Sequence, residues 1–182
     1  RSIVFSILLL LPIFIDSYYL DNISYFMCWT FISLGLAVIW GMGGILSFGQ
    51  TAFFGLAGYG FSVISINFLG IAGVSIWSVV LSLIITGIFG MIVGYFLFYG
   101  GIYDVFIGIV TLAITLVLET FMQQTAGPEY AIGSARLNGF NGMQGMPTIG
   151  FESLQFGLLE GITQYYFILL LAIIILISLY KF

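Results

Sequence analysis

Long apolar runs separated by short polar or glycine-rich connections dominate the pattern of this chain. Crossing the hydrocarbon core of a bilayer takes about 20 mostly apolar residues in a helix, and lipid offers the backbone no hydrogen-bond partners, so such runs are predicted to be helical. The runs are Ile3 to Ile15, Ile23 to Trp40, Thr51 to Leu69, Ile76 to Tyr99, Ile102 to Gln124 and Ile162 to Tyr180. The pattern therefore predicts an all-α fold, a polytopic transmembrane helix bundle of about six membrane segments.

The longest connection, Thr125 to Gly161, has the composition of an extramembrane loop. It contains Pro128 and Pro147 together with glycines and charged residues. The other connections are short, and nothing indicates a second domain. We therefore expect residues 1–182 to form a single transmembrane domain with residues 125–161 as its outer loop.

Alternate crossing allows the sidedness to be predicted. With a cytoplasmic N-terminus, Arg1 and Lys181 lie inside. The positive-inside rule favours that arrangement, although Arg136 in the long loop opposes it. We expect a multi-pass protein of the cell membrane with residues 125–161 outside.

The composition excludes several classes of function. Hydrophobic residues make up 62% and charged residues 5% of the chain, whereas about 25% of a typical soluble domain is charged. Seven acidic and three basic residues give a net charge of -4, which is too sparse for nucleic-acid binding. Histidine is absent and the one cysteine, Cys28, lies in an apolar run. No metal site, disulfide framework or cofactor is therefore predicted.

Glycines crowd the segment Gly41 to Gly60, which reads GMGGILSFGQTAFFGLAGYG. It also contains the polar residues Ser47, Gln50 and Thr51. Unwound backbone at membrane depth is tolerated only against protein or a water-filled cavity, so interrupted helices often line a substrate path. Close helix packing through small residues is the alternative. The polar residues favour a glycine-interrupted helix beside a pathway.

A second candidate is the polar face of the run Ile102 to Gln124. Thr111, Thr115, Glu119 and Gln123 recur at every fourth residue and therefore share one helix face. A charge near the bilayer centre costs at least about 2.5 kcal/mol, so Glu119 is expected to face the protein interior or water. Alternatively, Glu119 is solvated at the outer interface.

The third candidate is the part of the loop that reads GSARLNGFNGMQGMP, from Gly133 to Pro147. Its four glycines and two asparagines favour tight turns with positive φ. Loops of this length are usually functional or disordered. Arg136, its only base, either binds an acidic group or is simply solvated.

Catalysis by the chain itself is not expected. No histidine, nucleophile-base pair or carboxylate cluster occurs, and no Gly-x-x-x-x-Gly-Lys sequence for binding ATP phosphates is present. The sequence thus predicts a protein that is not an enzyme.

Three ordered segments resemble one known family. LAVIWGMGGILSFGQTAFFGLAGYG, from Leu36 to Gly60, looks like the permeases of ABC transporters for branched-chain amino acids and urea. GIYDVFIGIVTLAITLVLE, from Gly101 to Glu119, resembles the next signature helix, and NGMQGMP, from Asn141 to Pro147, resembles the extracytoplasmic Asn-Gly-x-x-Gly-x-Pro loop.

This resemblance implies a membrane subunit of an importer. The expected partners are a second homologous permease, two cytoplasmic ABC ATPase subunits and a soluble substrate-binding protein. The residues expected along the substrate pathway are Gly44, Ser47, Gln50, Thr51, Thr111, Thr115 and Glu119. The loop residues expected near the binding protein are Arg136, Asn141, Gly142, Gly145 and Pro147.

The match has two departures. The Thr-Gly-Gly run that commonly precedes the loop motif is replaced by residues 136–140, and the chain stops at Phe182 before the coupling loop of the family. We therefore expect a fragment of a longer permease. The alternatives are an ATP-independent channel or ion-coupled carrier that uses the polar face with Glu119, or an assembly subunit without a pathway. The sequence fits an amino acid or urea as substrate equally well.

Overall fold

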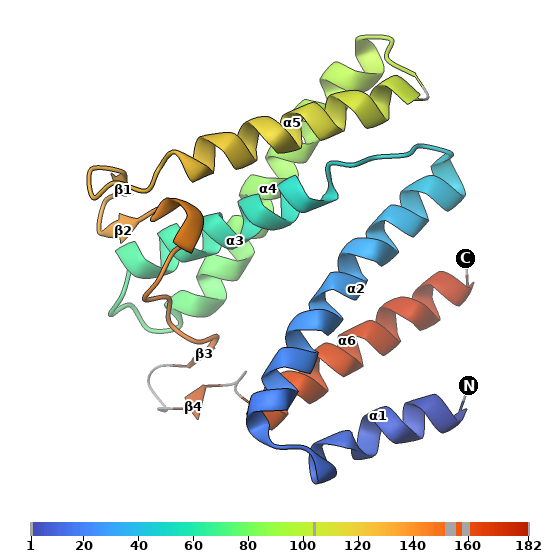
Figure 1. The fold of residues 1–182 in the computed structure, drawn as a ribbon, viewed down its shortest axis with the longest axis vertical. Helices are drawn as coiled ribbons and strands as arrows, with labels where there is room; N and C mark the ends of the chain where they lie inside the picture. The colour runs from blue at the N-terminus through green and yellow to red at the C-terminus, as the bar shows by residue number, and fades with distance from the viewer. Residues whose placement is uncertain (1, 104, 152–155, 158–160, 182) are drawn as a thin grey trace.

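The fold was obtained as a computed structural model, which describes residues 2–103, 105–151, 156–157 and 161–181 (Figure 1). The helices in this part of the chain are α1 (Ser2–Phe14), α2 (Ser17–Gly43), α3 (Gln50–Asn67), α4 (Val74–Tyr99), α5 (Val105–Gln123) and α6 (Gly161–Lys181). Each coincides with one predicted apolar run, although α2 begins before Ile23. The predicted cytoplasmic Arg1 lies outside the described residues.

Among the described residues, four helices are long and apolar enough to cross a membrane. They are α2, α4, α5 and α6. This confirms a polytopic helical membrane protein. The assignment of α1 and α3 as two further membrane segments stays a prediction.

The all-α prediction is wrong in the loop, which forms two short antiparallel hairpins. Strand β1 (Ala131–Ile132) pairs with β2 (Ala135–Arg136), and β3 (Gly150–Phe151) pairs with β4 (Phe156–Gly157). The first hairpin turns through two residues beginning with Gly133, whose φ of 64° suits a tight hairpin turn. A 3-10 helix, η1 (Gly139–Asn141), follows.

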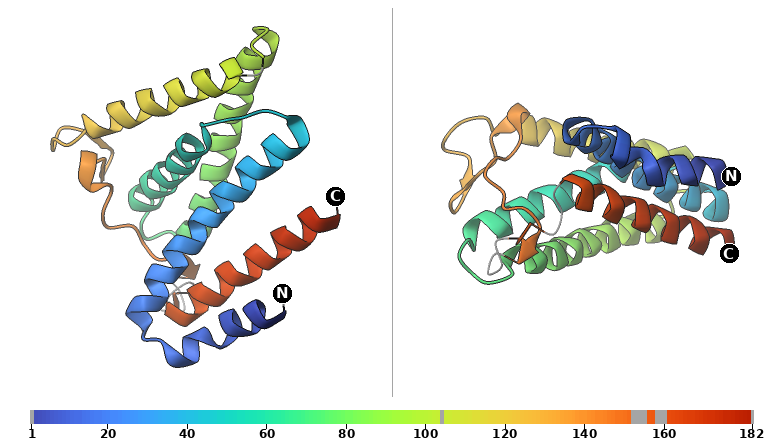
Figure 2. Two further views of the ribbon diagram at one scale, coloured as in Figure 1. Left: turned by 45° about the vertical axis from the view of Figure 1, so that its right-hand side comes forward. Right: turned by 90° about the horizontal axis from the view of Figure 1, so that it is seen from below.

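The helices form two groups. Helix α2 packs along α6, with α1 beside them, whereas α3 packs against α4 and α5 (Figures 1 and 2). Both chain termini lie on one side of the molecule, at the right in Figure 1, and the β1–β2 hairpin that follows α5 lies on the opposite side.

Exposed aromatic residues near the helix ends are consistent with a bilayer. Tyr18 and Trp40 on α2, and Trp77 and Tyr99 on α4, are all exposed. Each pair is separated by 22 residues, or about 33 Å of helix. That separation matches a hydrocarbon core of roughly 30 Å flanked by aromatic belts.

A proline inside α1 frees a backbone carbonyl for one of the contacts of this helix with α6. Pro12 has no N–H, so the carbonyl of Leu8, four residues earlier, loses its helical donor. The hydroxyl of Tyr165 donates to this oxygen at 2.7 Å, and Tyr165 is fully buried. The interior of this group therefore depends on a side chain replacing a missing backbone donor.

We predict that Tyr165→Phe lowers the free energy of unfolding by about 1–3 kcal/mol, because the Leu8 carbonyl is left without a donor. Unfolding of the detergent-solubilised protein by heat or SDS measures this loss. Pro12→Ala supplies an N–H at residue 12, so Tyr165→Phe is expected to cost less in that background. Equal costs in both backgrounds would contradict this explanation.

Candidate functional site

The predicted helix interruption is present at residues 44–49. Helix α2 ends at Gly43, and Gly44 adopts a left-handed conformation with a φ of 66°. The N–H of Gly44 donates to the carbonyl of Trp40 at 3.0 Å. No regular structure follows until α3 begins at Gln50, so we define residues 44–49 as the interrupted segment.

Two threonines of α5 bind the backbone of the interrupted segment. The N–H of Phe48 donates to Oγ1 of Thr111 at 3.1 Å. The hydroxyl of Thr115 shares its proton between the carbonyl of Thr111 at 2.9 Å and the carbonyl of Phe48 at 3.3 Å. The Thr111 hydroxyl itself donates to the carbonyl of Ile107 at 2.8 Å. Both backbone groups of Phe48 are thus satisfied by side chains, as lipid requires.

Glycines let the interrupted segment approach α5 closely. A Cβ added at Gly108 would lie 3.1 Å from the carbonyl oxygen of Leu46, and one at Gly49 would lie 3.3 Å from Cβ of Thr111. Ser47 is buried, and its hydroxyl accepts the N–H of Gly49 at 3.3 Å. These residues fix the backbone geometry of the segment.

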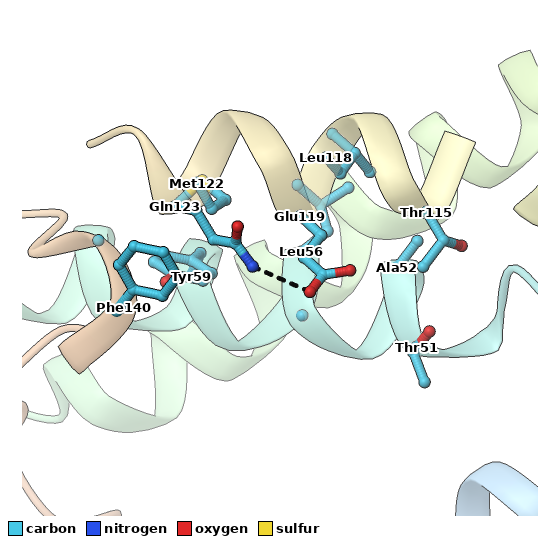
Figure 3. A pocket seen from close by; sticks show the side chains of 12 residues that line it. Thr51, Ala52, Leu56, Tyr59, Thr115, Leu118, Glu119, Met122, Gln123 and Phe140 are labelled. Atoms are coloured by element: carbon cyan, nitrogen blue, oxygen red, sulfur yellow. Dashed lines mark hydrogen bonds between the residues drawn. The ribbon is translucent and has the colours of Figure 1, made fainter. Parts of the chain in front are cut away.

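A pocket lies between α3 and α5, and η1 closes the end of it that is next to the loop (Figure 3). Its volume is ≈ 390 Å³. It is lined by Thr51, Ala52, Gly55, Leu56, Tyr59, Thr115, Leu118, Glu119, Met122, Gln123, Gly139 and Phe140. Inside it, Nε2 of Gln123 donates to Oε1 of Glu119 at 3.0 Å (Figure 3). We call this cavity the α3–α5 pocket.

The structure divides the predicted polar face of α5 into two parts. Thr111 is buried and bonded to the interrupted segment, whereas Glu119 and Gln123 line the pocket. Thr115 does both, because its hydroxyl donates to Phe48 and it also lines the pocket. The four-residue spacing correctly predicted a common face, but it did not separate these roles.

Other predicted pathway residues lie outside the α3–α5 pocket. Gln50 opens α3 with its amide near Gly35 of α2. Gly44 lines a second pocket of ≈ 290 Å³. That pocket has mainly apolar walls, formed by Trp40, Leu46, Phe48, Val105, Gly108, Ile109 and Leu112 beside Gly44. A pathway role for Gln50 or Gly44 stays a prediction.

Two aromatic residues of the pocket escaped the sequence reasoning. Tyr59 follows Thr51 and Gly55 at four-residue spacing, and this signal indicates a shared helix face. Phe140 gives no such signal, because η1 reaches the pocket only through the folding of the loop. Figure 3 shows both rings at the loop end of the pocket.

The long loop after α5 has the backbone geometry predicted from its glycines. Gly133, Gly139, Gly142 and Gly145 all have positive φ, as does Asn138.

Side chains of α3 and α4 attach this loop to the helices. Asn67 donates to the carbonyl of Ile132 at 2.7 Å and accepts the N–H of Ser134 at 2.8 Å. Ser75 of α4 donates to the carbonyl of Gly150 at 2.8 Å. The loop is therefore anchored at both of its ends.

The loop residues predicted to lie near a binding protein differ in exposure. Arg136, Asn141 and Gly145 are exposed, whereas Gly142 and Pro147 are half-buried. Their predicted contact with a partner stays a prediction.

We predict that Thr111→Val destabilises the protein by about 1–3 kcal/mol, because the N–H of Phe48 then lacks an acceptor. Thr111→Ser keeps the hydroxyl and is expected to retain most of the stability. Denaturant titration in detergent micelles compares the two variants. If valine and serine prove equally stable, Thr111 does not hold the interrupted segment as described.

We predict that Gly108→Ala also destabilises the protein, by roughly 1–3 kcal/mol, because the added methyl group crowds the carbonyl of Leu46 and the ring of Phe48. Gly87→Ala is the matched control, since a Cβ there meets nothing within 4 Å. The midpoint of thermal unfolding is the readout. A similar change for both variants would argue against close packing at Gly108.

Comparison with known proteins agrees with this architecture. A family model described as branched-chain amino acid transport system, permease component, matches residues 18–181. No curated protein and no solved structure gives a significant match. The family match extends from the start of α2 to the end of α6, so it includes the interrupted segment, the α3–α5 pocket and the outer loop. The chain therefore belongs to the family of permease components of branched-chain amino acid transport systems.

Proposed function

We propose that this protein is a membrane-spanning permease subunit of an ABC importer in the cell inner membrane. It forms part of the translocation pathway for branched-chain amino acids, urea or related small polar solutes. The match of residues 18–181 to the permease family is the observation that carries this proposal. A second homologous permease, two cytoplasmic ATPase subunits and a soluble binding protein complete the importer.

We place part of the pathway in the α3–α5 pocket. Its volume of ≈ 390 Å³ falls within the range of small-molecule sites. The pocket begins at Thr51, directly after the interrupted segment, and Figure 3 shows that it ends at Phe140 beside the outer loop. Its position between an interrupted helix and the extramembrane loop supports a route for a solute.

The proposed route includes α3 as a membrane segment. Helix α3 has 18 residues and is about 27 Å long, slightly less than the hydrocarbon thickness of about 30 Å. The interrupted segment supplies the rest of the crossing. With α1, this gives the six membrane segments expected from the sequence.

Transport then follows from a change in the relative stability of two conformations. ATP binding and hydrolysis in the partner subunits favour outward-open and inward-open forms in turn. Because Thr111 and Thr115 bind Phe48, we expect α5 and the interrupted segment to move together. The packing of α3 against α5 at the pocket is the contact that changes.

We predict that Gly55→Leu lowers ATP-dependent uptake by about tenfold or more, because its side chain fills the pocket. A loss of about 1.4 kcal/mol in solute binding at the pocket corresponds to a factor of ten. Gly58→Leu is the matched control. It lies on the same helix, a Cβ at either position meets nothing within 4 Å, and Gly58 does not line the pocket.

The measurement uses the complex purified from its native membrane and reconstituted into proteoliposomes, with labelled leucine and labelled urea as separate solutes. Mass spectrometry of each preparation checks that an ATPase and a second permease remain bound. Uptake that needs no nucleotide, from a preparation without an ATPase, would favour a channel or ion-coupled carrier instead. Equal uptake by the Gly55 and Gly58 variants would show that the solute does not pass through this pocket.

A further inference from the structure

The α3–α5 pocket contains a negative charge that a general route for polar solutes does not require. Among the described residues that line it, Glu119 alone carries a charge. Glu119 is an exposed residue of this wall, whose apolar part includes Leu56, Leu118 and Met122. Its carboxylate binds most strongly to a group that donates hydrogen bonds to it or carries a positive charge.

The hydrogen bonds inside the protein leave free acceptors at Glu119. One N–H of Gln123 is used by Oε1 of Glu119, so Oε2 of Glu119 and Oε1 of Gln123 remain as acceptors. The same lining also carries donors, namely the second N–H of Gln123 and the hydroxyls of Thr51 and Tyr59. The hydroxyl proton of Thr115 is directed at the backbone carbonyls of Phe48 and Thr111. At Glu119 itself, a ligand that donates N–H groups therefore fits better than one that only accepts.

The sequence offers the pocket no compensating cation. The basic residues of the whole chain are Arg1, Arg136 and Lys181. Arg136 lies on β2 with its side chain exposed, and it is not among the described residues that line the pocket. A solute carboxylate placed beside Glu119 would meet a like charge, which is unfavourable.

We infer that Glu119, oriented by Gln123, determines specificity in the α3–α5 pocket by selecting solutes through an N–H-donating head group. Ammonium groups bind best, neutral amides follow, and carboxylates are rejected. The apolar part of the solute lies against Leu56, Leu118 and Met122. For a zwitterionic amino acid, the ammonium group contacts Glu119 and the carboxylate stays away from it. This inference rests on the proposed function only in taking the pocket as part of the solute route.

Three probes with the same six-carbon skeleton separate the head groups: 4-methylpentan-1-amine, 4-methylpentanamide and 4-methylpentanoate. Their binding to the purified full-length complex is measured by the shift in its thermal unfolding midpoint across a concentration series, without nucleotide. We expect the apparent affinity to fall in the order amine, amide, carboxylate. Charge-assisted hydrogen bonds make a difference of roughly tenfold or more between amine and carboxylate reasonable.

Glu119→Gln is the decisive variant because it keeps the size of the side chain and removes its charge. It is expected to abolish the preference for the amine over the amide, with the amide bound as before. Glu129→Gln is the matched control, because Glu129 is an exposed loop residue outside the described lining of the pocket. Removing its charge should leave the affinities of all three probes unchanged. Gln123→Met tests the orienting role and should weaken amine binding by a smaller factor.

The inference is overturned if the carboxylate binds as well as the amine, if no probe binds, or if Glu119→Gln leaves the order of affinities unchanged. This assay needs no ATPase activity, so it can fail while ATP-dependent uptake succeeds. Conversely, selective amine binding without any ATP-driven uptake would retain the specificity of the pocket and reject the importer.

Discussion

The packing of the helices in this protein depends on one constraint. Lipid supplies no hydrogen bonds to backbone groups that leave the helical pattern. At two places in the described part of the chain, backbone groups outside the helical pattern are bound by side chains of a neighbouring helix. Thr111 and Thr115 bind Phe48 of the interrupted segment, and Tyr165 binds the Leu8 carbonyl that Pro12 leaves free. Each contact joins two helices, so the groups that repair the backbone also set the helix packing.

The α3–α5 pocket is a consequence of the hydrogen bonds between α5 and Phe48. Because Phe48 is bound to α5, α3 must begin beside α5 and present its following residues to that helix. Thr51, Gly55 and Tyr59 lie on the presented face, and Gly55 has no side chain to fill the space beyond it. The sequence left two roles open for the glycines of this region, close helix packing and an open pathway. The structure has close packing at Gly49 and open space at Gly55.

Patterns of neighbouring residues predicted the features that neighbouring residues determine, namely the helices and the turns. Hydrophobic runs of membrane length located the helices, and glycine content located the interrupted segment and the positive-φ turns of the loop. The pairing of Phe48 with Thr111 joins residues 63 positions apart, and the approach of Phe140 to the pocket depends on the folded loop. No spacing in the sequence encodes such contacts. For the same reason, the sequence predicts Thr111 as a pathway residue without indicating that its hydroxyl also binds the backbone of Phe48.

Thr115 connects the two halves of the α5 face, and this connection gives the pocket a means of responding to movement. Its hydroxyl binds the carbonyl of Phe48 while the same residue lines the pocket one turn before Glu119. A displacement of the interrupted segment relative to α3 therefore acts on the wall that carries the carboxylate. Packed helices tend to shift between discrete arrangements rather than deform continuously. A coupled movement of α5 and the interrupted segment would thus change how well Glu119 and Gln123 meet the head group of a solute.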